Sequence, residues 1–261
     1  SANDAAYAVA EHVAGDAEIF VEMMNDRARE LGMTDTHYVN VHGLPPNRGS
    51  PPNLMSSRDV GILAQELLKF PITTQWGRTK RASFRGGKFI LTNTNRLVGH
   101  FRGIDGLKTG FYRKAGFSIA STAKRGDLRL IAIILGSSHS RRRFKEARRL
   151  LSWGFAKFRW YKHKADNAGR TLSVKIQSGQ KNRVLLRSIG NFRKLVRRGE
   201  EGKISIRKEI PSSLSAPVKK GQQVGRLVFE IRGKQMGELR LAASEAVDRL
   251  GFFQTIIRYL Y

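Results

Sequence analysis

The residues best suited to chemistry stand in two short motifs, Lys-Thr-Gly at 108–110 and Ser-Ala-Asn at 1–3. The first lies at the end of a predicted strand, where an ordinary hairpin would carry Val or Ile. The second opens an Ala-rich segment that predicts a helix. Amine, hydroxyl and amide groups can transfer protons and hold polar substrates. Each motif also has a plainer interpretation: a basic residue before a turn for the first, helix capping for the second.

The segments around these motifs predict helices first and strands second. The apolar residues of the helix expected over 16–31 lie mostly on one face, and Pro/Gly/Asn-rich residues follow it over 33–54. Turn residues at Gly86-Gly87 and at 125–127 separate alternating segments, as in hairpins. The expected helices are 2–14, 16–31, 57–69 and 140–160, and the expected strands are a hairpin over 80–93 and segments at 106–110, 115–123 and 128–136.

The second part of the chain differs in composition from about Lys164 onward. Residues 171–245 alternate in short segments with Gly turns, which predicts a small all-β domain. The apolar residues of 248–261 follow a helical period and predict an amphipathic helix. We therefore expect three parts: a domain of helices and strands at 1–163, a β-rich domain at 164–247 and an amphipathic segment at 248–261, which either packs against the β-rich domain or a partner helix or lies in a membrane interface.

Several further segments occur in the same order as in one known family. They include THYVNVHGL, MSSRDVGILAQEL, LTNTNRL, RLLSWGF and APVKKGQQVGRLVFEIRGK. Together with the two motifs, they make the chain resemble a D-alanyl-D-alanine carboxypeptidase of the penicillin-binding protein 5/6 type. The resemblance implies an α/β (α+β) domain of the penicillin-binding/serine β-lactamase type, with helices around an antiparallel sheet. A small β domain and a C-terminal amphipathic helix would follow.

The resemblance also implies roles for individual residues. In this family a serine attacks the bond between two terminal D-alanines of a peptidoglycan stem peptide and forms an acyl-enzyme, and β-lactams acylate the same serine. Lys108 and Thr109 would hold the terminal carboxylate of the substrate. Gly110 would leave room for the peptide beside the strand, and the N–H of Phe111 would stabilise the oxyanion.

The opposite wall of the implied site is the first motif of the chain. Ser1 would relay a proton and Asn3 would hold the peptide amide. The catalytic set is thus Ser1, Asn3 and Lys108, and neither a cofactor nor a metal is expected. The six histidines show no His-Glu-x-x-His spacing, and no carboxylate cluster accompanies them.

One part of the family pattern is missing. The nucleophile belongs to a Ser-x-x-Lys motif that precedes the other two, and it requires a helix that puts serine and lysine on one face. The chain contains this spacing at 121–124 and 205–208, but both segments predict strands. We therefore expect an N-terminally incomplete catalytic domain that cannot acylate alone.

The charge distribution leaves other functions open. Residues 1–60 hold 4 Lys/Arg and 9 Asp/Glu, a net charge of −5, whereas the formal net charge of the whole chain is +27. Such a basic body attracts anionic lipid or nucleic acid, although no nucleic-acid motif is present. The alternatives to the enzyme are a catalytically silent cell-wall scaffold and a basic binding module. The resemblance favours the enzyme and places it in the periplasm, held by its C-terminal helix at the outer face of the cytoplasmic membrane.

Overall fold

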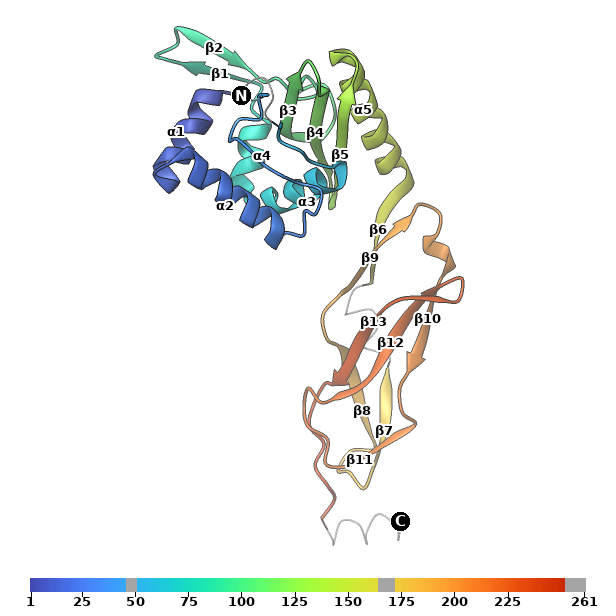
Figure 1. Ribbon diagram of the computed structural model, residues 1–261. Coiled ribbons are helices and arrows are strands. Elements are labelled where there is room, and N and C mark those ends of the chain that lie inside the picture. Colours follow the sequence, from blue (N-terminus) through green and yellow to red (C-terminus); the bar gives the residue numbers. More distant parts are fainter. Residues whose placement is uncertain (46–50, 164–171, 252–261) are drawn as a thin grey trace. The chain divides into compact units, whose positions relative to one another are not determined.

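The computed structural model describes residues 1–45, 51–163 and 172–251. The chain divides into two compact units, Ser1–Ala156 and Lys157–Tyr261. Figure 1 shows helices and a small sheet in the first unit and strands throughout the second. No helix in the described residues is long and apolar enough to cross a membrane.

The first unit begins with helices and continues with strands. Asp16 caps α2 by accepting hydrogen bonds from the N–H groups of Glu18 and Ile19, and Ser56 caps α3 through the N–H of Asp59. The helices are α1 (Asn3–Ala14), α2 (Ala17–Glu30), α3 (Ser57–Leu67), α4 (Pro71–Gly77) and α5 (Ser140–Lys157). The strands are β1 (Arg81–Phe84), β2 (Phe89–Thr92), β3 (Ile104–Tyr112), β4 (Gly116–Arg125) and β5 (Leu128–Ser137).

The central sheet of this unit has the order β3-β4-β5, and both pairs are antiparallel. Helix α5 lies against it so closely that a Cβ on Gly154 would come 2.6 Å from Leu130 Cδ1. Helix α4 packs against β3, and α3 packs against β5. β1 and β2 form the expected hairpin, with Phe84 opposite Phe89. β3, which carries the Lys-Thr-Gly motif, is therefore an edge strand that pairs with β4 and packs against α4.

The second unit is built from strands around its own apolar core. Its six-stranded sheet has the order β10-β12-β13-β8-β7-β11, and β6 pairs separately with β9. Phe229 is fully buried and stacks on Phe192 with 3.8 Å between the ring centroids. The strands are β6 (Phe158–His163), β7 (Ser173–Gln177), β8 (Arg183–Ser188), β9 (Phe192–Arg197), β10 (Ile204–Glu209), β11 (Ser213–Ser215), β12 (Gln223–Ile231) and β13 (Lys234–Ala243).

The structure corrects three expectations. Helix α5 ends at Lys157 rather than near residue 160, because Phe158–His163 pairs with β9 as a strand. Helix α4 was not expected: no helix was predicted between the one expected over 57–69 and the hairpin over 80–93, but Pro71 occupies the first turn of a new helix. Residues 248–251 are not helical, because Arg249 forms a β-bridge with Gly179. The remainder of the expected amphipathic helix, 252–261, lies outside the described residues.

Candidate active site

A groove of about 550 Å³ runs beside β3 in the first unit. Its walls come from segments far apart in the sequence: the chain start, α4, the base of the β1–β2 hairpin and β3. The side chains with polar or aromatic groups in this lining are Ser1, Thr73, Trp76, Thr79, Arg81, Thr92, Asn93, Thr94 and Lys108. The groove thus brings together the two motifs singled out in the sequence.

The contact between these motifs is direct. Lys108 Nζ donates to Ser1 Oγ at 2.6 Å, although the two residues are 107 positions apart. The same ammonium donates to the carbonyl oxygen of Thr109 at 2.5 Å. Lys108 is exposed as a residue, but these two hydrogen bonds hold its ammonium beside Ser1 in the lining of the groove. A lysine and a serine in this arrangement can pass a proton between them.

The environment of Lys108 makes that transfer easier. Partial burial of its ammonium, and secondarily the positive charge of Arg143, lower the pKa of Lys108 below its ordinary value of 10.5. Both causes disfavour the protonated form. The amine therefore releases its proton at a lower pH than a solvent-exposed lysine does.

Thr109 points in the opposite direction from Lys108, as alternation along a strand requires. It is buried, and its hydroxyl donates to the hydroxyl of Thr94 at 2.7 Å. Thr94 lines the groove as well. The sequence interpretation included LTNTNRL only as a matching segment and missed Thr94 as a site residue. Thr94 lies two residues after the end of β2, and no sequence pattern selected it.

The two residues after Thr109 face solvent. A Cβ on Gly110 would meet only Ser118 Cβ, at 4.0 Å, so no atom of the described chain requires glycine here. Phe111 is 55% exposed and its ring stacks on Phe117 at 4.1 Å. The strand edge at Gly110 is therefore open, and the expected roles of Gly110 and Phe111 stay predictions.

The first motif does not serve as a helix cap. The N-cap position of α1 is Ala2, and no side chain accepts a capping hydrogen bond there. Asn3 is the first residue of α1 and is exposed. No described residue forms a hydrogen bond with its side chain. Ser1 instead bonds to Lys108, so capping does not explain why this motif is present.

Arg143 is a second residue that the sequence interpretation missed. It lies in the first turn of α5 and is only 8% exposed. Its Nη1 donates to the carbonyl oxygens of Gly110 at 2.9 Å and Ser118 at 3.1 Å, which are register partners in β3 and β4. Its guanidinium also lies over the rings of Phe117 and Phe144. Arg143 thus fixes the strand ends beside Lys108 and supplies the charge that acts on it.

Replacement of this arginine tests both effects. We expect Arg143→Gln to lower the free energy of unfolding by about 1–3 kcal/mol, because two carbonyl groups lose a charged donor. The substitution should also raise the pKa of Lys108, because it removes a nearby positive charge. Hydrogen exchange of peptides covering 104–125 measures the first effect, and the pH dependence of Lys108 modification by an amine reagent measures the second. Arg142→Gln removes the same charge from the exposed neighbour and should change neither. Equal effects of the two substitutions would contradict this assignment.

The two internal Ser-x-x-Lys sequences lie on strands, as predicted. Ser121 and Lys124 belong to β4, and Ser205 and Lys208 belong to β10. In a strand, residues three apart point to opposite faces. Ser121 is accordingly fully buried while Lys124 is exposed. Neither pair can act as a serine nucleophile with its lysine.

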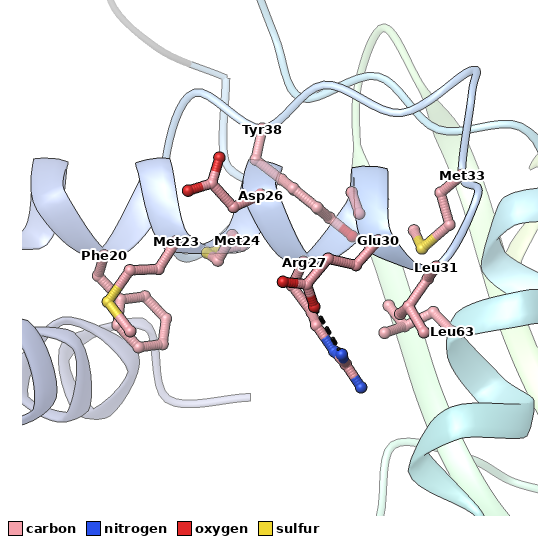
Figure 2. A pocket seen from close by; sticks show the side chains of 11 residues that line it. Phe20, Met23, Met24, Asp26, Arg27, Glu30, Leu31, Met33, Tyr38 and Leu63 are labelled. Atoms are coloured by element: carbon pink, nitrogen blue, oxygen red, sulfur yellow. Dashed lines mark hydrogen bonds and ion pairs between the residues drawn. The ribbon is translucent and has the colours of Figure 1, made fainter.

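Another hollow of about 550 Å³ lies on α2 and has a different character. Figure 2 shows Phe20, Met23, Met24 and Leu31 along one side of the helix, with Met33 and Leu63 nearby. Of its charged members, Arg27 and Glu30 pair with each other at 2.7 Å, and Asp26 pairs with Arg29. Neither Ser1 nor Lys108 lines this hollow, so the groove beside β3 is the candidate site.

Comparison with known proteins identifies the family of this chain. Residues 1–139 match the D-alanyl-D-alanine carboxypeptidase family, and residues 162–249 match the C-terminal domain of penicillin-binding protein 5. The chain belongs to the D-alanyl-D-alanine carboxypeptidases, as a low-molecular-mass penicillin-binding protein of the 5/6 type. The resemblance found in the sequence is therefore confirmed, as is the penicillin-binding/β-lactamase-like α/β domain followed by a β-rich domain.

Individual relatives match along nearly the whole chain. The D-alanyl-D-alanine carboxypeptidase DacF of Bacillus subtilis is 33% identical over 99% of this chain, and DacC of Escherichia coli is 33% identical over 97%. Penicillin-binding protein 5 from Haemophilus influenzae covers 95% of this chain and 71% of its own, with a TM-score of 0.68 and 28% identity. The chain spans 66% and 62% of the lengths of DacF and DacC.

Proposed function

We propose that residues 1–261 form the larger part of a serine-type D-Ala-D-Ala carboxypeptidase that removes the terminal D-alanine from peptidoglycan stem peptides. The observation that carries the proposal is the 2.6 Å contact between Ser1 Oγ and Lys108 Nζ in the groove beside β3. Membership of the family supports the proposed reaction, and the contact in the groove beside β3 supports its proposed location. The proposal extends to β-lactams, since a relative, penicillin-binding protein D2 from Listeria monocytogenes, was solved in an ampicillin-bound form.

The reaction requires two kinds of groups in the groove: groups that transfer protons and groups that bind the substrate. A serine oxygen attacks the carbonyl carbon of the penultimate D-alanine, the C–N bond breaks, and the departing amine takes a proton. In the proposal, Ser1 and Lys108 pass that proton, and water then hydrolyses the ester. Lys108 holds the substrate carboxylate, while Thr109, which is buried and donates to a hydroxyl of the groove wall, supports that wall. Asn3 holds the peptide amide, and the N–H of Phe111 faces the oxyanion. Gly110 leaves the strand edge open to the peptide.

The attacking serine is not among residues 1–261 in this proposal. Both internal Ser-x-x-Lys sequences lie on strands, and a segment outside the present sequence would supply the nucleophile together with its lysine. Residues 1–261 alone would then hold the carboxylate-binding and proton-relay groups without being able to form an acyl-enzyme.

Intact-mass spectrometry after incubation with penicillin tests this division. We expect no covalent adduct on residues 1–261 and one penicilloyl adduct on the product of the gene extended upstream. Rapid stoichiometric labelling of residues 1–261 would show that the nucleophile is within them. If neither protein is labelled, the enzyme proposal gives way to the catalytically silent scaffold.

The location follows from the same proposal. A carboxypeptidase of stem peptides acts where peptidoglycan is, so we propose the periplasm, at the outer face of the cytoplasmic membrane. The excess of basic residues supports attraction to anionic lipid. Fractionation of cells, with release of the protein from membranes by high salt, would measure this association. Recovery of the protein in the cytosolic fraction would contradict the proposed location.

A further inference from the structure

A third hollow in the first unit lies between α5 and the turn at 96–100. Its volume is about 420 Å³. Leu97 and Phe144, which are 2% and 8% exposed, form its apolar floor. The remaining side chains of the lining are all basic: Arg96, His100, Arg141, Lys145 and Arg148. No residue of the groove beside β3 belongs to this set, so the hollow is separate from the candidate active site.

The basic side chains converge from two segments. Arg141, Lys145 and Arg148 recur at intervals of four and three along α5, which places them on one face of the helix. Arg96 and His100 come from the turn. Arg148 Nη2 donates to the carbonyl oxygen of His100 at 3.3 Å and so joins the two segments. The hollow is therefore a concave site whose basic side chains come from two segments of the chain, and it differs from a solvated basic face of a single helix.

In the described part of the chain, no carboxylate balances these charges. Glu146, the acidic residue nearest in sequence, pairs with Arg149 at 3.3 Å. Within residues 1–45, 51–163 and 172–251, no carboxylate lies within ion-pair distance of Arg96, Arg141, Lys145 or Arg148. The first turn of α5 also holds no acidic residue, although the N-terminal end of a helix favours negative charge. The cluster therefore repels itself and lacks the counter-charge that its position favours.

We propose that this hollow binds a phosphate group. Guanidinium groups donate paired hydrogen bonds that match phosphate oxygens, and lysine adds a compact positive charge. A phosphate group, with one negative charge as a diester or nearly two as a monoester, would relieve the repulsion among four permanent cations. The N-terminal end of α5 adds to the attraction. The phosphate can belong to a soluble phosphate compound or to the headgroup of an anionic lipid, and the two sources separate by experiment.

Calorimetric titration of the 261-residue chain with pyrophosphate, at constant ionic strength, tests the site. The pocket variant is Arg141→Gln/Lys145→Gln, since the structure describes both side chains as exposed and without hydrogen bonds or ion pairs. The control variant Lys194→Gln/Lys208→Gln removes the same charge from exposed positions of the second unit. We expect binding to weaken at least tenfold in the pocket variant and to stay within twofold in the control. Arg96→Gln, from the other wall, should weaken binding as well.

Vesicle sedimentation distinguishes the source of the phosphate. Stronger binding to phosphatidylglycerol vesicles than to phosphatidylcholine vesicles, lost in the pocket variant and kept in the control, would identify a lipid headgroup. Pyrophosphate binding with equal sedimentation by the pocket and control variants would identify a soluble phosphate compound. Equal losses of all binding in the pocket and control variants would attribute it to overall charge and overturn the site. Absence of both pyrophosphate and phosphatidylglycerol binding in the unsubstituted chain would overturn it too.

Discussion

In a chain extended upstream to include its nucleophile, Lys108→Ala should lower the rate of penicillin acylation by about 10²–10⁴-fold, the range typical of a lost proton-transfer group. Ser1 Oγ would lose the ammonium that lies 2.6 Å away. The carboxylate of the penicillin would also lose the cation proposed to hold it. Acylation measured with a fluorescent penicillin, as a second-order rate constant, reports both losses together.

The matched control for this substitution is Lys114→Ala. Lys114 is exposed in the turn between β3 and β4, and its removal changes the net charge equally. We expect the acylation rate of this control to stay within twofold of the unsubstituted protein. A comparable loss in both variants would show that overall charge, rather than the position of Lys108, attracts the substrate. A Lys108→Ala protein of unchanged rate would remove Lys108 from the catalytic set.

In the second unit, Phe229→Ala should lower the free energy of unfolding by about 3–5 kcal/mol, as expected for a large aromatic side chain deleted from a core. Phe229 is fully buried. Its ring stacks on Phe192 at 3.8 Å and meets the edges of Tyr161 at 6.2 Å and His163 at 5.1 Å. A cavity at this point would remove contacts with two neighbouring strands, β6 and β9, at once.

The neighbouring strand offers the control. Ile206 lies opposite Phe229 in the β10–β12 pair but is 38% exposed, so Ile206→Ala should cost much less. Hydrogen exchange of peptides from 172–251 measures the loss in this unit without assuming that the whole chain unfolds in one step. Similar losses for Phe229→Ala and Ile206→Ala would contradict the arrangement of the core described above.

Local sequence signals predicted most elements of the first unit because caps and turns determine them. Asp16 and Ser56 accept the hydrogen bonds of helix N-caps, and Gly86 and Gly87 both have positive φ in the hairpin turn. The predicted end of α5 was wrong because a contact with β9, which is distant in the sequence, determines where the helix stops. Phe158 continues the apolar period of the helix, but pairing with β9 places it in a strand. Helix α4 was missed because Pro71 is compatible with both the end and the start of a helix.

The candidate site was predictable where motifs mark it and not elsewhere. Ser1 and Lys108 were selected from their motifs, and the structure brings them into contact. Arg143 could not be selected, because it stands in a run of three arginines of which it alone is buried. Only the packing of α5 on the sheet separates it from Arg141 and Arg142. The spacing of the three arginines does not show which of them is buried, because the packing of the folded chain determines it.

The alternation along β3 has a consequence for how this sequence can change over time. Lys108 faces the groove and Thr109 is buried, so substitution at either position alters only the contacts of that side chain. Insertion or deletion of one residue in the strand would instead exchange the two faces, sending the lysine inward and the threonine outward. The irregularity between Ile104 and Gly106 is the one place along this described strand pair where an extra residue is already absorbed. Selection should therefore act against insertions or deletions of an odd number of residues in this strand, as well as on which residues it contains.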